Sequence, residues 1–133
     1  VESVPCEVAA RREPLEQVLL HLVQNAVDAS SADSPVFVRL GVDGLNGCIE
    51  VIDSGIGMSP EFVRSRLFKP FVSTKQGGFG IGAYEARELV RAMQGRLDVE
   101  SREGLGSRFE VRLPLAEAAQ LIKTFSDKDK KVA

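Results

Sequence analysis

The amino-acid sequence predicts an α+β fold, a two-layer α/β sandwich in which one mixed sheet of about five strands carries its helices on one face. Apolar residues recur at helical spacing in two long segments and alternate in several short ones. Strands and helices do not alternate regularly along the chain, which excludes a doubly wound sheet. With 133 residues, 44% of them hydrophobic, the chain is long enough for one core.

Local signals place the elements. Pro5 interrupts the first alternating segment and so favours an edge strand, whereas Pro14 and Pro60 suit the first turns of helices. Ser59 is a suitable N-cap, and Gly95 is a suitable helix stop. The expected order is an edge strand within 1–9, a helix over 15–30, a hairpin of strands over 36–42 and 48–53, a short helix over 60–67, a long mobile loop over 68–82, a helix over 81–93, and strands over 97–101 and 109–113.

Composition excludes several classes of function. A formal net charge of −2 gives no electrostatic footprint for nucleic acid. No segment is long and apolar enough to cross a bilayer, so no direct membrane contact is expected. One histidine and two distant cysteines, Cys6 and Cys48, cannot form a Cys/His zinc site or a disulfide scaffold. A reducing, cytoplasmic location is therefore expected, which leaves open a membrane anchor elsewhere in the parent protein.

Glycines gather in three clusters at the ends of expected strands or helices. They are Asp53-Ser54-Gly55-Ile56-Gly57-Met58, Gly77-Gly78-Phe79-Gly80-Ile81-Gly82 and Gly104-Leu105-Gly106-Ser107. Glycine loops often cradle phosphates with backbone N–H groups, and the second cluster also opens a helix, whose N-terminus favours anions. The Walker and dinucleotide-binding patterns are both absent. Each cluster taken alone also fits an ordinary tight turn.

Asn25 stands in the middle of the first long helix, on a polar stripe with His21 and Asp28. Asparagine is a poor helix former, so helix propensity does not explain Asn25, and a functional role is one interpretation. The other interpretation is an ordinary exposed residue on the helix surface. Together with the ordered glycine clusters, however, Asn25 completes a recognisable set of motifs.

This set resembles the ATP-binding catalytic domain of sensor histidine kinases, within the superfamily of gyrase, heat-shock chaperone and mismatch-repair ATPases. The resemblance covers roughly Glu13 to Leu115 and implies the Bergerat-type ATP-binding fold, with residues 116–133 as a tail, partly helical and then disordered. Around residues 73–85 the sequence is similar to the sensor kinases of PEP-CTERM/exosortase systems. The matching segments are His21-Leu22-Val23-Gln24-Asn25-Ala26, Asp53 to Met58, Leu67-Phe68-Lys69-Pro70-Phe71, Gly78 to Gly82, and Gly104 to Phe109.

The resemblance implies a role for each matching position. Asn25 would ligate Mg²⁺, a cation that prefers oxygen ligands and shares its shell with phosphates. Asp53 would accept a hydrogen bond from the adenine amino group, which favours adenine over guanine. Lys75 would contact phosphate, with Lys69 as second candidate. The ATP-binding residues implied are Asn25, Asp53, Gly55, Gly57, Met58, Phe71, Lys75, Gly78, Phe79, Gly80, Ile81, Gly82 and Ser107.

Several of these positions also have plain structural interpretations. Met58, Phe68 and Phe71 could simply pack in the core, and Ser107 is expected to be mainly structural. A loop lysine is often only solvated. Glu85 could act as an acid or base but is expected to face solvent.

His21 and Asp28 depart from parts of the family pattern. His21 stands where the ATPase branches carry the glutamate that activates water, which argues against strong hydrolysis. It would instead contact phosphate or a Mg-bound water, and together with Asn25 and Lys75 it forms the expected catalytic set. The alternative is an ordinary histidine on the helix face. Asp28 replaces a basic residue of many kinases, so a phosphate contact from position 28 is in doubt.

The function expected from the resemblance is Mg-ATP binding and transfer of the γ-phosphoryl group to a histidine, with ATP and Mg²⁺ as cofactors. The acceptor would lie on a dimerisation domain of the same parent protein, which would pass the phosphoryl group to a response regulator. Autophosphorylation is not expected from this chain alone. The alternatives are an ATPase clamp module and a non-catalytic nucleotide-binding docking domain.

Overall fold

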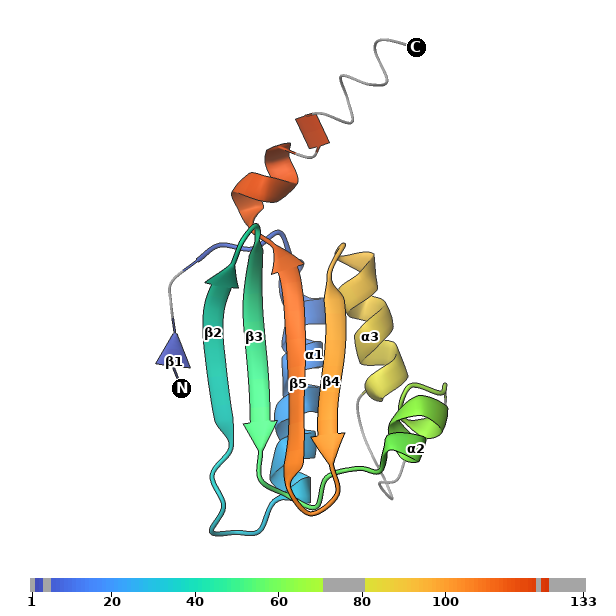
Figure 1. Cartoon of the computed structure of the whole chain (residues 1–133). Helices are drawn as coiled ribbons and strands as arrows, with labels where there is room; N and C mark the ends of the chain where they lie inside the picture. Colours follow the sequence, from blue (N-terminus) through green and yellow to red (C-terminus); the bar gives the residue numbers. More distant parts are fainter. Residues whose placement is uncertain (1, 4–5, 71–80, 122, 125–133) are drawn as a thin grey trace.

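A computed structural model of the chain describes residues 2–3, 6–70, 81–121 and 123–124. Its five-stranded sheet has the order β1-β2-β3-β5-β4, and α1 and α3 lie on one face of it (Figure 1). Because β1 is parallel to β2 and the other pairs are antiparallel, the sheet is mixed, as predicted. The elements are β1 (Glu2–Ser3), α1 (Arg12–Ala29), β2 (Phe37–Asp43), β3 (Asn46–Asp53), α2 (Pro60–Phe62), the π-helix η1 (Val63–Leu67), α3 (Ala83–Ala92), β4 (Arg96–Arg102) and β5 (Gly106–Pro114).

The core lies between the sheet and the two long helices. Side chains alternate along each strand, so one set of β3 and β5 residues faces the helices and the other set faces away. Full burial of a large aliphatic side chain such as Leu22 stabilises the fold by roughly 1.5–3 kcal/mol. The most completely buried large side chains are Val18, Leu22, Val51, Val90, Val111 and Leu113.

The long helices and the hairpin follow the predicted patterns with small shifts. Helix α1 begins at Arg12, a turn's length before the predicted start, since Pro14 lies in the first turn, where no backbone N–H needs a partner. It ends at Ala29, and the Ser30 hydroxyl donates to the Ala26 carbonyl at 2.6 Å. The hairpin turn is shorter than predicted because Gly44 adopts φ +60 between paired Asp43 and Asn46.

Two other segments differ more from the prediction. Residues Glu2–Ser3 pair with β2, whereas Val8 forms only an isolated bridge with Leu115, so the edge strand is shorter than 1–9. The short helix starts at Pro60 with Ser59 as its cap, as predicted, but its second part is a π-helix rather than an α-helix. The Ser59 hydroxyl accepts a hydrogen bond from the Phe62 backbone at 3.1 Å.

The described part of the tail begins as a helix. Residues 116–121 are helical and project from the end of β5 (Figure 1). Ala118 is buried, which ties the first turn to the body of the domain. The predicted disordered end, residues 125–133, lies outside the described residues. Among the residues that are described, no helix is long and apolar enough to span a membrane.

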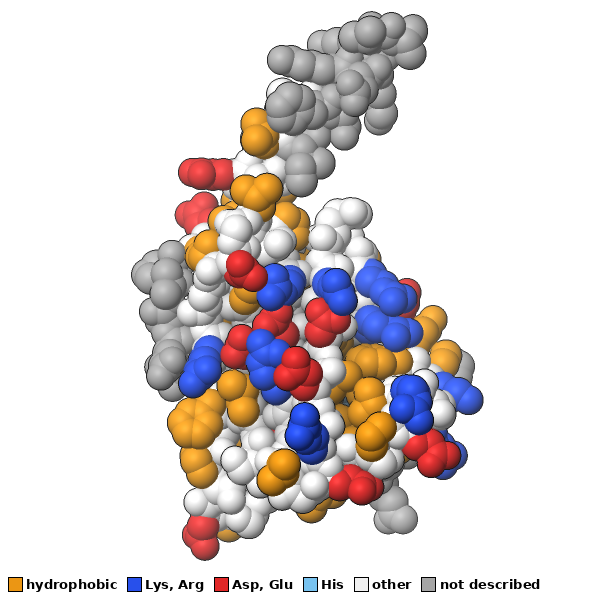
Figure 2. All heavy atoms as spheres, viewed as in Figure 1, with side chains coloured by type: hydrophobic (Ala, Val, Ile, Leu, Met, Phe, Trp, Pro, Cys, Tyr) orange, Lys and Arg blue, Asp and Glu red, His pale blue; other side chains and the backbone are white. Residues whose placement is uncertain are grey.

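The face of the sheet opposite the helices carries charged side chains over much of its surface (Figure 2). Apolar side chains interrupt the charges between β4 and the α2–η1 segment, where the surface is hollowed. The two faces of the sheet therefore present different chemistry.

Candidate functional site

Helix α1 presents His21 and Asn25 one turn apart, both half-buried. The Asn25 side-chain nitrogen lies 3.3 Å from Nε2 of His21. An amide nitrogen can only donate, so Nε2 is the acceptor in this arrangement. With the Asn25 amide assigned in this way, its oxygen is not the atom that faces His21.

Asp53 ends β3 and is buried, with 6% of its surface exposed. One carboxylate oxygen accepts a hydrogen bond from the Gly55 backbone at 2.9 Å. Among the described residues, the other oxygen has no hydrogen-bond partner. A buried carboxylate with an unfilled acceptor position is suited to a ligand that brings an N–H group.

Asp53 is enclosed by the first and third glycine clusters, which the fold brings together. Gly106 has φ +117, and a Cβ atom there would lie 2.1 Å from the Asp53 carbonyl oxygen. Gly57 has φ +68, and its Cβ would lie 1.9 Å from the carbonyl oxygen of Arg102. Only glycine fits such close approaches at positive φ. Gly57 and Gly106 therefore both have a structural requirement, which for Gly57 comes in addition to its predicted role in ligand approach.

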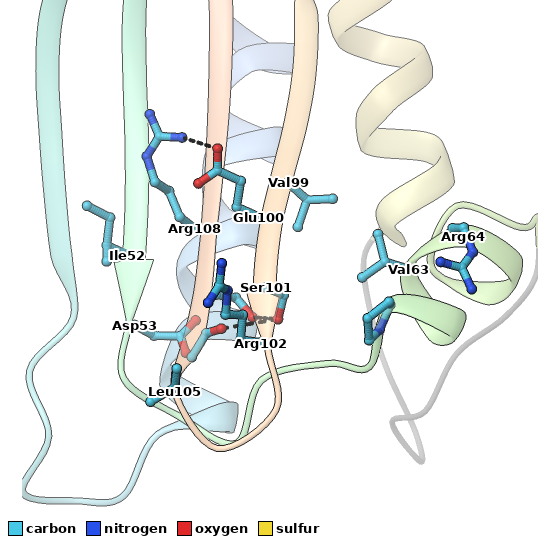
Figure 3. A pocket seen from close by; sticks show the side chains of 13 residues that line it. Ile52, Asp53, Val63, Arg64, Val99, Glu100, Ser101, Arg102, Leu105 and Arg108 are labelled. Carbon is cyan, nitrogen blue, oxygen red and sulfur yellow. Dashed lines mark hydrogen bonds and ion pairs between the residues drawn. The ribbon is translucent and has the colours of Figure 1, made fainter.

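A serine pair joins the same loops. Ser101 on β4 accepts a hydrogen bond from the Met58 backbone at 2.8 Å and donates to the Gly106 carbonyl at 3.1 Å. The Ser101 and Ser107 hydroxyls lie 2.7 Å apart. Figure 3 shows Ser101 and Asp53 at this end of the strands. Sequence reasoning included Ser107 but missed Ser101, because a serine within a strand gives no distinctive signal.

The loop after Asp53 is also fixed to α1. The Ile56 backbone donates to the Ala29 carbonyl at 3.2 Å, at the end of the helix that carries Asn25 one turn earlier. Asp28 is exposed and accepts a hydrogen bond from Gln24 at 2.9 Å. The structure thus holds the Asp53 loop against the C-terminal turns of α1.

The N-terminus of α3 corrects the expectation for Glu85. This side chain is half-buried, and its carboxylate accepts a hydrogen bond from the Gly82 backbone at 3.0 Å. An acidic residue in the first turn also interacts favourably with the helix dipole. The spacing of Glu85 three residues after the N-cap is a sequence signal that could have revealed this role.

The predicted residues between β3 and α3 are only partly described. Met58, Phe68 and Ile81 are half-buried and pack against the core, so their structural interpretation holds. The Arg87 guanidinium lies 4.5 Å from the Phe68 ring centroid. Five predicted site residues lie outside the described residues, namely Phe71, Lys75, Gly78, Phe79 and Gly80.

Comparison with known proteins gives the family. Residues 10–117 match the family described as histidine kinase-, DNA gyrase B-, and HSP90-like ATPase. The chain belongs to this ATPase-domain family. The glycine clusters and Asn25 thus belong to a domain of an ATPase family. The fold described above is that of the histidine kinase catalytic domains.

Curated relatives of this ATPase domain are sensor kinases. Sporulation kinase E of Bacillus subtilis (strain 168) is 33% identical over 121 residues, which cover 90% of this chain and 16% of the relative. The C4-dicarboxylate transport sensor protein DctS of Rhodobacter capsulatus is 40% identical over 115 residues, covering 83% of this chain and 17% of the relative. The chain therefore spans only about a sixth of the length of these two relatives.

Solved histidine kinases share the architecture. The nucleotide-free catalytic domain of histidine kinase ThkA superposes with a TM-score of 0.68 at 29% identity, covering 79% of this chain and 68% of that one. Full-length ShkA in complex with AMPPNP gives a TM-score of 0.65 at 32% identity, covering 77% of this chain and 22% of ShkA. The two-layer fold of this ATPase domain is thus that of histidine kinase catalytic domains.

Proposed function

We propose that this ATPase domain is the Mg-ATP-binding catalytic domain of a sensor histidine kinase, and that it transfers the γ-phosphoryl group of ATP to a histidine on a separate dimerisation domain of its parent protein. The observation that carries the proposal is the buried Asp53 carboxylate, held by Gly55 and enclosed by Gly106, with one oxygen left for a ligand. The similarity to ShkA, solved in complex with AMPPNP, supports a nucleotide as that ligand.

Asp53 would select the base. Its unfilled oxygen would accept a hydrogen bond from the exocyclic amino group of adenine. Guanine has a carbonyl oxygen at the corresponding position. That oxygen and the carboxylate are both acceptors, so no hydrogen bond would form between them and guanine would bind more weakly. Met58 would pack against the base, and Gly57 would allow the backbone to approach it.

Asn25 fits a magnesium ion that is held mainly by the nucleotide. Mg²⁺ usually takes one or two protein oxygens and completes its octahedral shell with phosphate oxygens and waters. The described residues contain no group of three or more His, Cys, Asp or Glu side chains that could hold a metal ion. A single amide oxygen from Asn25 is consistent with such a shared site, in which the ion would neutralise phosphate charge. Lys75 and the glycines Gly78, Gly80 and Gly82 would contact the phosphates.

His21 would position Asn25 rather than activate water. Its Nε2 lies 3.3 Å from the Asn25 side-chain nitrogen and would accept the amide proton. In that arrangement His21 keeps the Asn25 oxygen directed elsewhere, as a cation would require. The same hydrogen bond makes Nε2 a poor general base for a water molecule, which favours a kinase over the alternative of an ATPase clamp module. The third possibility, a docking domain without catalysis, is disfavoured by the ordered set of motifs.

The partners follow from this chemistry. His21 is the only histidine of the chain and is already bonded on α1, so the phosphoacceptor would lie on another domain of the parent protein. A response regulator would then receive the phosphoryl group. No nucleic-acid partner and no direct membrane contact are proposed, and the site of action would be the cytoplasm.

Phosphotransfer in trans tests the proposal. The 133-residue chain is mixed with radiolabelled Mg-ATP and with the separately produced acceptor domain of the parent protein. Acid-labile, base-stable label is expected on the acceptor domain only when the chain is present, and the Asp53→Asn variant should transfer much less. Rapid release of free phosphate without labelling would instead support the ATPase clamp. Nucleotide binding with neither labelling nor release of phosphate would support the non-catalytic docking domain.

A further inference from the structure

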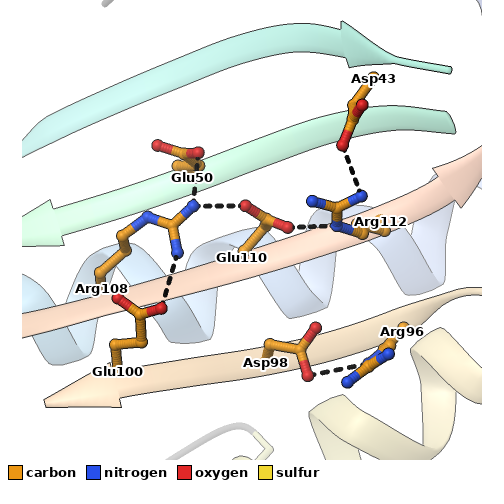
Figure 4. A network of polar contacts seen from close by, with 8 residues as sticks. All are labelled: Asp43, Glu50, Arg96, Asp98, Glu100, Arg108, Glu110 and Arg112. Atoms are coloured by element: carbon orange, nitrogen blue, oxygen red, sulfur yellow. Dashed lines mark hydrogen bonds and ion pairs between the residues drawn. The ribbon is translucent and has the colours of Figure 1, made fainter.

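The open face of the sheet has one half in which the charges are paired. Glu110 is buried there at 5% exposure and forms ion pairs with Arg108 and Arg112 (Figure 4). Arg108 also pairs with Glu50 at 2.7 Å, and Arg112 pairs with Asp43 at 2.8 Å. These side chains satisfy one another, so this half needs no ligand.

The other half is a hollow between β4 and the α2–η1 segment, with a volume of about 570 Å³. Figure 3 shows Val63 and Val99 on its two sides, and Figure 2 shows the apolar surface between them. Leu105 is 69% exposed at its lower end. We call this surface the β4–α2 hollow. Its apolar lining is aliphatic: Ile52, Pro60, Val63, Val99 and Leu105.

Arginines dominate the rim of the β4–α2 hollow. Arg64, Arg102 and Arg108 line it, against the exposed carboxylate of Glu100 and the buried one of Asp53. Arg64 and Arg102 are exposed, and neither has an ion pair or hydrogen bond to another described residue. Because Arg108 is already paired with Glu50, Glu100 and Glu110, the positive charge of the rim comes from Arg64 and Arg102, although the whole chain has a net charge of −2. A positive rim around an aliphatic floor is complementary to an acidic, aliphatic ligand.

We propose that the β4–α2 hollow binds a short acidic segment of a partner protein. An aliphatic side chain of that segment would enter between Val63 and Val99, and its flanking carboxylates would pair with Arg64 and Arg102. Guanidinium groups bind carboxylates through two parallel hydrogen bonds, which suits two exposed arginines for which the described residues provide no ion-pair partner.

The charges on the rest of this face argue against a larger polyanion. A nucleic acid or an anionic membrane would also meet the carboxylates of Asp43 and Asp98, which lie outside the hollow. A short segment can place its own carboxylates beside the arginines alone. We therefore assign the hollow to a peptide segment rather than to an extended anionic surface.

The β4–α2 hollow adjoins the proposed nucleotide site, because Asp53 and Ser107 are among the residues that line it. No residue of α1 lines it, so neither Asn25 nor His21 takes part. The valines and arginines that carry this inference have no part in the proposed nucleotide function, so failure of the inference would leave that function intact.

Fluorescence anisotropy with a synthetic probe tests the inference. The probe is a short labelled peptide in which two leucines are flanked by glutamates. One control peptide replaces the leucines with serine, and another replaces the glutamates with lysine. The leucine–glutamate peptide should bind the 133-residue chain, and both control peptides should bind at least about tenfold more weakly.

Charge reversal locates the binding. The double variant Arg64→Glu, Arg102→Glu should lower the affinity for the probe at least about tenfold, whereas Arg12→Glu, a reversal at an exposed arginine of α1, should change that affinity less than about twofold. Amide NMR shifts on binding should centre on Val63, Val99 and Leu105.

Several results would overturn the inference. They are no binding of the probe, equal binding of the serine peptide, and equal affinity of the double variant and the parent chain for the probe. Tighter binding of anionic lipid vesicles or of single-stranded DNA than of the probe, when lost in the double variant, would assign the hollow to a polyanion instead.

Discussion

The side-chain nitrogen of Asn25 lies 3.3 Å from Nε2 of His21, one turn earlier on the same helix. This hydrogen bond links the two polar residues of α1 into one unit, because the acceptor His21 determines which end of the Asn25 amide faces it. The role proposed for Asn25 needs the oxygen at the other end. The account of the site therefore depends on a pair of residues rather than on Asn25 alone.

Replacing His21 should reduce the contribution of magnesium to nucleotide binding. His21→Leu removes the hydrogen-bond acceptor, so the amide of Asn25 is no longer oriented. The gain in ADP affinity on adding Mg²⁺ should therefore fall by about fivefold, which corresponds to the loss of one hydrogen bond of roughly 1 kcal/mol. Metal-free ADP affinity should stay unchanged. Calorimetric titrations with and without Mg²⁺ measure both quantities.

His21→Gln is the matched control, because its side-chain oxygen is as many bonds from Cβ as Nε2 is in histidine and can accept the same proton. It should restore most of the magnesium effect. Long-range nitrogen NMR of the single histidine should show the tautomer with its proton on Nδ1. If the leucine and glutamine variants respond alike to magnesium, His21 does not position Asn25.

Asp53→Asn should exchange the preference between bases. Gly55 would continue to hold the side-chain oxygen, so the new amide would present its NH₂ group to the ligand. Affinity for ADP should fall about tenfold or more, and the ratio of ADP to GDP affinity should fall further, since guanine offers an acceptor to that NH₂ group. Competition titrations with both nucleotides measure the ratio. An unchanged ratio would remove Asp53 from base recognition.

Gly106→Ala should destabilise the domain by roughly 2–3 kcal/mol, because its φ of +117 and the 2.1 Å approach to Asp53 both exclude a Cβ atom. Gly104→Ala is the control, since Gly104 has φ +79 but nothing within 4 Å of its Cβ position, and it should cost about 1 kcal/mol. Urea unfolding gives both values. Equal losses would show that the close approach to Asp53 does not matter.

Acid should weaken the ion pairs on the open face of the sheet. A hydrogen bond from Arg108 lowers the pKa of Glu50 below its ordinary value of 4.5. The stability that Glu50 contributes is therefore fully present above about pH 4.5 and is lost as the pH falls through the lower pKa of the folded state.

Glu50→Gln should accordingly lower the free energy of unfolding by about 1 kcal/mol at pH 7, and the difference from the parent chain should shrink towards zero in strong acid. Glu16→Gln is the control, because the Arg12–Glu16 pair is largely exposed and should contribute little at any pH. Denaturant unfolding across the pH range checks this. A constant difference between the Glu50 variant and the parent would contradict the assignment.

The local elements of the fold could be predicted from the sequence, but the strand order could not. Alternation in β3 and β5 and helical spacing in α1 and α3 are local signals, and the structure confirms them. The insertion of β5 between β3 and β4 depends on contacts between residues far apart in the chain, such as Asp53 beside Ser107, which no local period records. The change from α- to π-helix after Phe62 likewise has no signal in the sequence pattern.

For the site, the motif residues were predictable and their supports were less so. Asn25 and Asp53 stood out because an asparagine within a helix and an acidic residue before a glycine cluster are unusual. Ser101 did not stand out, since its hydrogen bonds to the Met58 backbone and to Ser107 appear only once β4 lies beside β5. Glu85 had a signal in its spacing from Gly82, but the expectation placed it in solvent.

Calorimetric titration of the 133-residue chain with ADP, with and without Mg²⁺ and with Asn25→Ala as comparison, tests the central claim most directly. The account predicts one ADP site per chain, tighter when Mg²⁺ is present, and a magnesium effect that disappears in Asn25→Ala while metal-free binding persists. No heat of ADP binding in either condition, or an undiminished magnesium effect in Asn25→Ala, would contradict it.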